Sequence, residues 1–241
     1  MPNHWEPAHH RGRTARNYIL DSISDETLSR MSHGLERVSL RSGNVLFGPS
    51  KPIDHVYFPE DAMVSVVAYT PDGQSAEAGV IGWEGVAGID IVMGSTKTLN
   101  ENIIQLPGTA YRIPAATVKE EFVRGADLQK QVLSFTRLLI FQISQTALCN
   151  GLHSVEKRLA RWLLMCHDRT DGNELQLTQD FMGIMLGVSR VSVSQSAAIL
   201  QSRGLIEYRR GKIRVTDRHG LEAFTCNCYG TVKNEYERSR R

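Results

Sequence analysis

Cysteines and long apolar runs are scarce in this sequence. Its four cysteines, Cys149, Cys166, Cys226 and Cys228, all lie in the second half of the 241 residues, which argues against the disulfide framework of a small secreted domain. No run of 18 or more apolar residues occurs, and the polar residues 1–16 contain no hydrophobic signal region. We therefore predict a cytoplasmic protein that keeps its cysteines reduced and has no membrane partner.

Proline is absent from the last 127 residues, because all eight prolines lie at or before Pro114. Ten of the twenty glycines fall between Gly34 and Gly108, among short β-like runs such as Met63 to Thr70 before a Pro-Asp-Gly turn. Repeated short strands with Gly and Pro turns are typical of a rolled antiparallel sheet. From about Ala115 the apolar period becomes helical. The expected fold class is α+β, with an N-terminal antiparallel β-roll (jelly-roll-like) followed by helices.

The net charge of +2 conceals a difference between the two parts of the chain. Residues 1–150 contain 13 Lys and Arg against 16 Asp and Glu, a net charge of −3. Residues 151–241 contain 15 against 10, a net charge of +5. The basic surplus therefore belongs to the C-terminal part, where it favours a polyanionic partner.

A long helix is predicted between these two parts. One apolar stripe repeats at steps of three and four residues, and Leu138, Ile140, Phe141 and Leu148 add a second apolar face. Such a helix is expected to pack against two neighbours, the β-roll and the same helix of a second subunit, unless one chain buries it entirely. The stripe assigned to the dimer helix consists of Leu128, Val132, Phe135, Leu139 and Ile143.

Residues 177–206 have the pattern of two short helices joined by a tight turn. Thr178 and Ser189 suit the two N-caps, and Gly187 stands where the turn needs a permissive residue. The outward face of the second helix is small, polar and singly basic, as a helix in the major groove requires. The apolar residues expected to face inward are Phe181, Ile184, Met185 and Leu186 on the first helix and Val193, Ala197 and Leu200 on the second.

A basic hairpin is predicted directly after these helices, turning near Arg210-Gly211. Together these features resemble the winged helix-turn-helix of the Crp/Fnr family of bacterial transcription regulators, above all in Leu186-Gly187-Val188-Ser189-Arg190 and in Leu200-Gln201-x-x-Gly204-Leu205-Ile206. The resemblance covers roughly residues 20–225. It implies a flexible N-terminal arm (1–17), a β-roll sensor domain (18–126), a dimerisation helix (127–150) and a winged helix-turn-helix DNA-binding domain (151–241).

The resemblance also implies which residues contact DNA. Arg190 suits a guanine base, whereas Val191 and Gln195 stand where the family usually has Glu and Arg, so the family's usual half-site is not expected. The residues assigned to base readout are Arg190, Val191, Ser194 and Gln195. The residues assigned to phosphate contacts are Thr178, Gln179, Ser189 and Ser192, together with Arg209, Arg210 and Lys212 at the tip of the hairpin.

The N-terminal half lacks the signatures of the family's known cofactors. Gly82-Trp83-Glu84-Gly85 resembles only the start of a cyclic-nucleotide phosphate cassette, and Lys97 is a poor substitute for its arginine. N-terminal cysteines for an iron–sulfur cluster are missing. The isolated histidines His33, His55 and the pair His9-His10 suit the solvated surface better than haem. No cofactor is predicted, and the candidate pocket for an unknown small-molecule effector is formed by Gly82, Glu84, Gly85 and Lys97.

No metal site is predicted either. Cys226-x-Cys228 offers only two soft ligands and poor disulfide geometry, so both cysteines are expected to pack on a C-terminal helix, with a redox response left open. A cupin-like jelly-roll metalloenzyme is the alternative function, but it needs clustered histidines, and His55 is the only one between Gly34 and Pro114. We predict a non-enzymatic homodimer that binds a palindromic site in double-stranded DNA, with RNA polymerase as a further partner.

Overall fold

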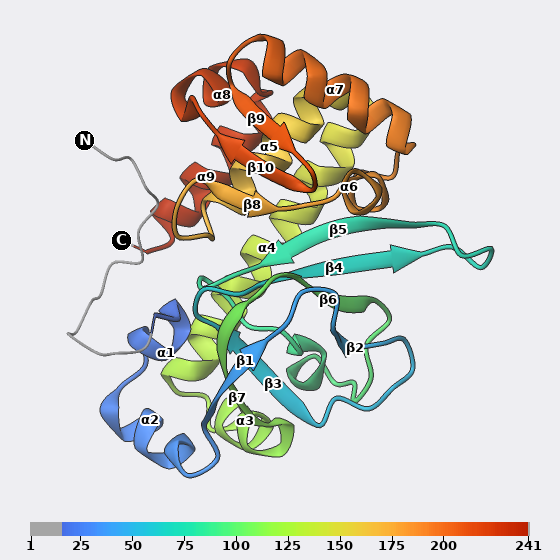
Figure 1. The fold of residues 1–241 in the computed structure, drawn as a ribbon. Helices are drawn as coiled ribbons and strands as arrows, with labels where there is room; N and C mark the ends of the chain where they lie inside the picture. The colour runs from blue at the N-terminus through green and yellow to red at the C-terminus, as the bar shows by residue number, and fades with distance from the viewer. Residues whose placement is uncertain (1–15, 241) are drawn as a thin grey trace. The chain divides into compact units, whose positions relative to one another are not determined.

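The structure is a computed structural model that describes residues 16–240 (Figure 1). The chain forms two compact units, residues 1–66 with 80–139 and residues 67–79 with 140–241. The predicted α+β class is confirmed, because an antiparallel β domain is followed by a long helix and a helix-turn-helix with a small sheet. The predicted domain bounds stay a prediction. The unit boundaries fall instead within the long helix and within one hairpin.

The first unit contains most of the β-structure. One sheet has the strand order β1-β7-β3 and the other β2-β6-β4-β5. Strand β7 pairs antiparallel with both β1 and β3, and β2 pairs antiparallel with β6. The strands are β1 (Glu36–Leu40), β2 (Val45–Phe47), β3 (His55–Pro59), β4 (Met63–Tyr69), β5 (Ser75–Ile81), β6 (Glu101–Leu106) and β7 (Gly108–Pro114), and the helices are α1 (Tyr18–Ser22), α2 (Asp25–Ser32), the 3-10 helix η1 (Ile89–Val92) and α3 (Ala115–Val123).

Asn17 fixes the start of this unit. Its side-chain oxygen accepts hydrogen bonds from the N–H groups of Ile19 and Leu20 and so caps α1, while its Nδ2 donates to the carbonyl oxygens of Pro59 and Gly85, both at 2.8 Å. The residue is fully buried. The flexible arm predicted for residues 1–17 is therefore wrong at Asn17, and its first 15 residues lie outside the described part of the chain.

The long helix α4 (Asp127–Leu152) confirms the helical period expected in this region. Of the stripe assigned to the dimer helix, Leu128, Val132, Phe135 and Leu139 are buried within the single chain, and Ile143 is half-buried. Intrachain packing therefore already occupies this stripe, which corrects its assignment to a dimer contact. The large apolar side chains that α4 leaves exposed are Leu133, Ile140, Leu148 and Leu152.

Among the described residues, α4 is also the only single helix that is long and apolar enough to cross a membrane. A helix at the core of a soluble protein passes the same test. Burial of one stripe against its own chain accounts for much of the apolar composition of α4.

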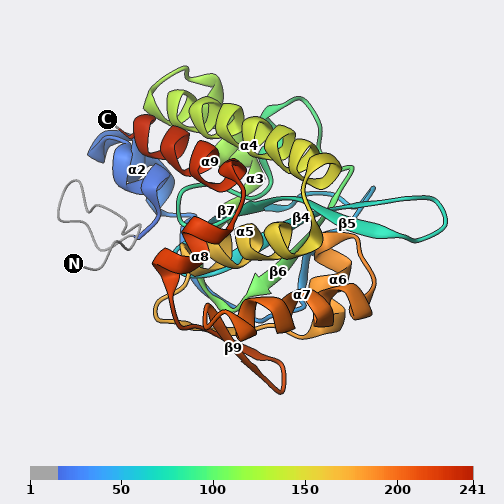
Figure 2. The ribbon, with the colours of Figure 1, turned by 90° about the horizontal axis from the view of Figure 1, so that it is seen from above.

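The second unit consists of the tip of the β4–β5 hairpin, the end of α4 and the helices and strands that follow. Its small sheet has the order β8-β10-β9. The last helix runs beside α4 (Figure 2), and Gln142 Nε2 donates to the buried Tyr236 hydroxyl at 3.2 Å. The elements are α5 (Val155–His167), β8 (Glu174–Gln176), α6 (Gln179–Leu186), α7 (Arg190–Ser202), β9 (Ile206–Arg209), β10 (Lys212–Val215), α8 (Arg218–Phe224) and α9 (Asn227–Arg238).

Candidate DNA-binding interface

Helices α6 and α7 meet at 105°, an angle typical of a helix-turn-helix. Gly187 ends α6 in the left-handed conformation with φ of 61°, as predicted, and its N–H donates to the carbonyl oxygens of Gly183 and Ile184. A Cβ atom at Gly183 would lie 3.0 Å from the carbonyl oxygen of Val188. Both glycines are therefore needed for the close approach of α6 to the turn.

The hydroxyls of Thr178 and Ser189 cap the two helices. Thr178 Oγ1 accepts a hydrogen bond from the N–H of Phe181 at 3.2 Å, and Ser189 Oγ accepts one from the N–H of Ser192 at 3.1 Å. A capping hydroxyl still carries one hydrogen, which can be donated to a phosphate oxygen. Thr178 and Ser189 are exposed, and the two other residues assigned to phosphate on these helices, Gln179 and Ser192, are half-buried beside them.

Helix α7 separates its buried and exposed residues clearly. The inward stripe of Val193, Ala197 and Leu200 is buried, as expected, and α7 packs on α5. On the opposite side, all four residues assigned to base readout are exposed. The helix therefore presents one uninterrupted face to solvent, with a single long basic side chain at its N-terminal end. The residues of this face are Arg190, Val191, Ser194 and Gln195.

Helix α6 follows the expectation in part, and Phe181 at its N-terminal end is half-buried. Met185 and Leu186 are buried as predicted, but Ile184 is 48% exposed and Met182 is buried in its place. With 3.6 residues per turn, positions 182, 185 and 186 share one side of the helix and position 184 faces away. The prediction for Ile184 was wrong because it followed hydrophobicity rather than the helical period.

The predicted hairpin is the β9–β10 pair, which turns at Arg210 and Gly211 with φ values of 47° and 81°. Strand β8, which the sequence analysis did not predict, adds a third strand beside β10. Arg209, Arg210 and Lys212 are exposed at the tip. Two of them lie in ion pairs, Arg209 with Glu207 at 2.8 Å and Lys212 with Glu174 at 2.9 Å.

These exposed ion pairs are weak enough for the basic side chains of the hairpin to leave their carboxylate partners and bind other anions. The Lys212 ammonium lowers the pKa of the Glu174 carboxyl through their hydrogen bond, but both side chains are about half exposed. Exposed ion pairs of this kind stabilise a protein by about 0–1 kcal/mol, so a phosphate can replace the carboxylate at little energetic expense.

Arg218 belongs to the interior and not to the hairpin surface, although it lies close to the hairpin in sequence. Its Nη2 contacts Asp168 Oδ1 at 2.5 Å, and the Tyr229 hydroxyl donates to the same carboxylate. Burial is the largest single influence and lowers the pKa of Arg218, but Asp168, Tyr229 and Glu222 together raise it above its ordinary value. A buried charge of this kind must be paired, so Arg218 serves the packing of α8 and α9.

Arg190 lines a cleft of about 650 Å³ between the helix-turn-helix and the tip of the β4–β5 hairpin, formed on the other side by Gly73, Gln74 and Ser75. Its Nε lies 3.7 Å from Asp180 Oδ1 across an exposed pair. The guanidinium is thus held beside α6 only weakly, and its release toward a base edge requires the loss of one solvated ion pair.

The residues assigned to an effector pocket do not line an open site. Gly82, Glu84 and Gly85 are buried, and the Glu84 carboxylate accepts a hydrogen bond from the N–H of Gly82 at 3.1 Å. A Cβ atom at Gly85 would lie 2.1 Å from the ring of Phe135. Lys97, in contrast, is exposed on a loop. Gly85 therefore allows the close packing of α4, and the first three residues are buried rather than exposed in an accessible cavity.

The two cysteines expected only to pack lie in a group that was not predicted. Cys226 and Cys228 are buried, as expected, but Cys149 and His153 lie directly against them. The signal present in the sequence was the C-x3-H spacing at the end of α4, which places both side chains on one face of a helix. No pattern of neighbouring residues in the sequence indicates that this pair meets Cys226 and Cys228 in the fold.

Comparison with known proteins agrees with this architecture. A family model of Crp-like helix-turn-helix domains matches residues 157–224. The chain carries a Crp-like helix-turn-helix domain. A sequence search finds no match among curated proteins. The predicted resemblance to the Crp/Fnr family is confirmed, in sequence over this domain and in fold over the longer chain.

Solved structures share the fold of nearly the whole chain. A protein from Eubacterium rectale described as a transcriptional regulator of the Crp/Fnr family is 16% identical, with a TM-score of 0.67 over 85% of this chain and 96% of that one. FixK2 from Bradyrhizobium japonicum is 15% identical, with a TM-score of 0.67 over 80% and 98%. A CRP/FNR-family regulator from Thermus thermophilus is 19% identical, with a TM-score of 0.62 over 78% and 97%. At these identities the likeness shows a shared fold.

Proposed function

We propose that the protein is a cytoplasmic, homodimeric, sequence-specific transcription regulator whose two copies of α7 enter successive major grooves of a palindromic operator. The observation that carries the proposal is the exposed face of α7. It combines one long donor, Arg190, with the short side chains of Val191 and Ser194 and with Gln195, while the opposite stripe is buried. A recognition helix needs both properties.

The chemistry of this face predicts what it reads. Arg190 can donate two hydrogen bonds to O6 and N7 of guanine, Gln195 suits adenine, and Val191 can contact the methyl group of thymine. The hairpin tip, with Arg209, Arg210 and Lys212, would add phosphate contacts that fix the register without reading bases.

Dimerisation through α4 is part of the proposal. The side chains of Leu133, Ile140 and Leu148 remain exposed along one line of the helix, at steps of seven and eight residues. That spacing is close to two helical turns, as in the seam of a paired helix. Two-fold symmetry then predicts half-sites about 34–36 Å apart. RNA polymerase is the further partner, and the N-terminal unit would transmit a small-molecule signal.

The test measures DNA binding by fluorescence anisotropy after the preferred site has been selected from random duplexes. Arg190→Ala should lower affinity by about 1–3 kcal/mol and abolish the preference at one base pair per half-site. Lys212→Ala should weaken binding to all sequences alike. It should also reduce the slope of log affinity against log salt concentration by about one, because one phosphate contact is lost.

Arg124→Ala supplies the matched control, because Arg124 is an exposed arginine of the first unit. We expect its affinity and specificity to equal those of the wild type. Uniform loss of affinity in both Arg190→Ala and Lys212→Ala would overturn base readout by Arg190. A single asymmetric half-site protected by a monomer would overturn the dimeric arrangement.

A further inference from the structure

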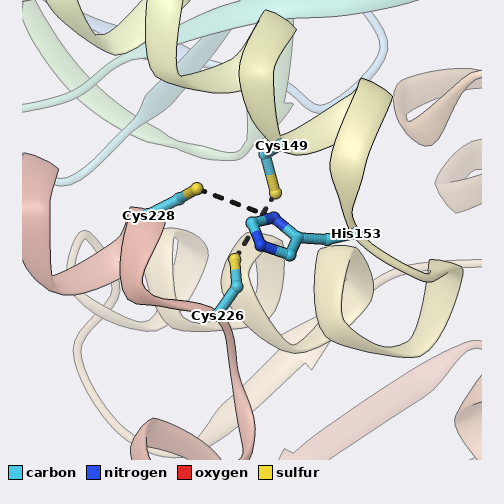
Figure 3. A group of neighbouring side chains, drawn as sticks. All are labelled: Cys149, His153, Cys226 and Cys228. Carbon is cyan, nitrogen blue, oxygen red and sulfur yellow. Dashed lines mark hydrogen bonds between the residues drawn. The ribbon is translucent and has the colours of Figure 1, made fainter.

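Four potential metal ligands converge in the second unit, outside the face that is proposed to meet DNA. Figure 3 shows Cys149, His153, Cys226 and Cys228 pointing toward one another. Cys149 lies in the last turns of α4 and His153 directly follows this helix. Cys226 is the N-cap of α9 and Cys228 lies in its first turn. The three cysteines are buried, and the histidine is half-buried.

The spacing of the ligand atoms fits one tetrahedral ion. All four atoms lie within 4.8 Å of one another. Cys149 Sγ and Cys226 Sγ are 3.5 Å apart, and Cys228 Sγ is 3.7 Å from His153 Nδ1. Zinc–sulfur and zinc–nitrogen bonds of ordinary length at tetrahedral angles give edges of about 3.8 Å between two sulfurs and about 3.5 Å between sulfur and nitrogen. A disulfide would require about 2.05 Å, and all four cysteines of the chain are free thiols.

We propose that Cys149, His153, Cys226 and Cys228 bind one Zn²⁺ ion in a closed, tetrahedral Cys3His site. Three thiolates and one imidazole are a donor set that selects zinc over hard ions such as Mg²⁺ or Ca²⁺. Because the protein fills all four positions, no coordination site is left for water or substrate. The site is therefore structural and not catalytic. This inference does not depend on the proposed operator or on dimerisation.

The surroundings of the cluster favour anionic sulfur. The hydrogen bond from Cys149, together with the N–H of Cys228, lowers the pKa of Cys226 to about 5, although burial opposes this. The same shared proton, together with burial, raises the pKa of Cys149, and burial raises the pKa of Cys228. Zinc binds cysteine as thiolate, so binding should release the protons that these thiols carry.

Arg161 supplies the compensating charge. Three thiolates and Zn²⁺ carry a net charge of −1, and the guanidinium of Arg161, which is only 4% exposed, lowers the pKa values of Cys149 and Cys228 by its charge. Its Nη2 donates to Thr146 Oγ1 on α4 at 3.0 Å, which holds the guanidinium near the cluster. A buried anionic zinc site needs such a partner.

The position of the ligands in the chain indicates what the ion does. Cys149 and His153 precede the Crp-like domain, residues 157–224, and Cys226 and Cys228 follow it. One ion would therefore join the two ends of this domain, across a separation of 77 residues between Cys149 and Cys226. Closing so long a loop restricts the unfolded chain and fixes α9 to the end of α4.

The experiment uses the full chain without a polyhistidine tag, purified under reducing conditions. Elemental analysis should find about one zinc ion per chain. After replacement by Co²⁺, the absorption spectrum should show tetrahedral d–d bands and thiolate-to-cobalt charge-transfer bands, and Zn²⁺ should abolish both. Zinc removal by a chelator should lower the melting temperature of the second unit, and the addition of Zn²⁺ should restore it.

Variants separate a ligand role from a packing role. Cys226→Ser should reduce the zinc content to less than about a tenth of an ion per chain, whereas Cys166→Ser, at a buried cysteine outside the cluster, should retain the ion. His153→Cys should still bind zinc, and its cobalt form should show stronger charge transfer, which packing alone would not produce. A double change of His9 and His10 to Gln excludes binding by histidines near the N-terminus.

Three results would overturn the proposal. The first is a wild-type chain without zinc after incubation with one equivalent of Zn²⁺ and dialysis. The second is a cobalt spectrum without charge-transfer bands, which needs no variant and holds even if Cys226→Ser fails to fold. The third is a disulfide between Cys149 and Cys226 in the reduced preparation, detected by mass spectrometry.

Discussion

Gly85→Ala tests how closely α4 packs in the first unit. A Cβ atom at this position would lie 2.1 Å from Cε2 and 2.3 Å from Cζ of Phe135. Carbon atoms in contact are ordinarily about 3.5–4.0 Å apart, so the ring and the new methyl group must separate by about 1.5 Å. Gly85 is not among the glycines with positive φ. The substitution therefore introduces a steric conflict without backbone strain.

The expected loss is large for the addition of one carbon. Phe135 is 3% exposed and is attached to a helix, so its ring has no solvent to move into. Overpacking a well-filled core destabilises a protein by about 1–3 kcal/mol, and contact with several ring atoms places Gly85→Ala near the upper value. In a protein of this size, about 3 kcal/mol corresponds to a decrease in melting temperature of about 6–12 °C.

Calorimetry and urea unfolding of the first unit measure the effect, with two controls. At Gly48, also in this unit, an added Cβ would lie 3.7 Å from Lys51 Cδ, which is an ordinary van der Waals contact. Gly48→Ala should therefore leave the free energy of unfolding unchanged. In the double variant with Phe135→Leu, the smaller side chain should recover more than about 1 kcal/mol of the Gly85→Ala loss. Equal effects of Gly48→Ala and Gly85→Ala, or strict additivity with Phe135→Leu, would refute the reasoning.

Two further predictions concern acid stability and assembly. Burial raises the pKa of Asp127, but hydrogen bonds from Thr27 Oγ1 at 2.7 Å and from the N–H of Ser24 lower it from 3.8 to about 2. Because the folded-state pKa is depressed, the stabilisation is present above about pH 4 and is lost as the pH falls toward 2. Asp127→Asn should flatten this part of the urea-unfolding profile, and an unchanged slope would contradict the assignment. Ile140→Glu, at a side chain that is 57% exposed, should give monomers in sedimentation, whereas Leu99→Glu, at 90% exposure, should leave dimers. A dimer that survives Ile140→Glu would place the interface elsewhere.

The helix-turn-helix was predictable because its signals are local. The capping hydroxyls of Thr178 and Ser189, the left-handed Gly187 and the apolar spacing of α7 all act within four residues, so their meaning does not depend on the rest of the fold. The hairpin turn at Arg210 and Gly211 is equally local. Ile184, which was predicted to be buried and is exposed, shows the limit of such signals. When a short helix has apolar residues on several sides, its sequence alone does not determine which side is buried.

Features that depend on contacts distant in sequence were missed. In the sequence, Arg218 is one of the basic residues that give residues 151–241 their positive charge, and only the folded chain brings Asp168, 50 residues earlier, beside it. Cys149 and Cys226 are 77 residues apart. Each of the two short motifs, Cys149-x3-His153 and Cys226-x-Cys228, supplies only two ligands by itself. The stripe of α4 was found correctly as a periodicity, but only the folded chain shows that it is already occupied and that Leu133, Ile140 and Leu148 remain outside.

Arg210 shows that the tip of the hairpin is not optimised for stability. Its φ of 47° lies in the left-handed region, where Asn and Gly are favoured and a long side chain is disfavoured by about 1 kcal/mol. An Asn at this position would make a more relaxed turn. The chain instead holds a permanent positive charge at the outermost point of the hairpin, on a backbone that two strands keep in one conformation. The backbone that carries the charge is thus already ordered, so a phosphate bound at the tip would restrict only the side chain.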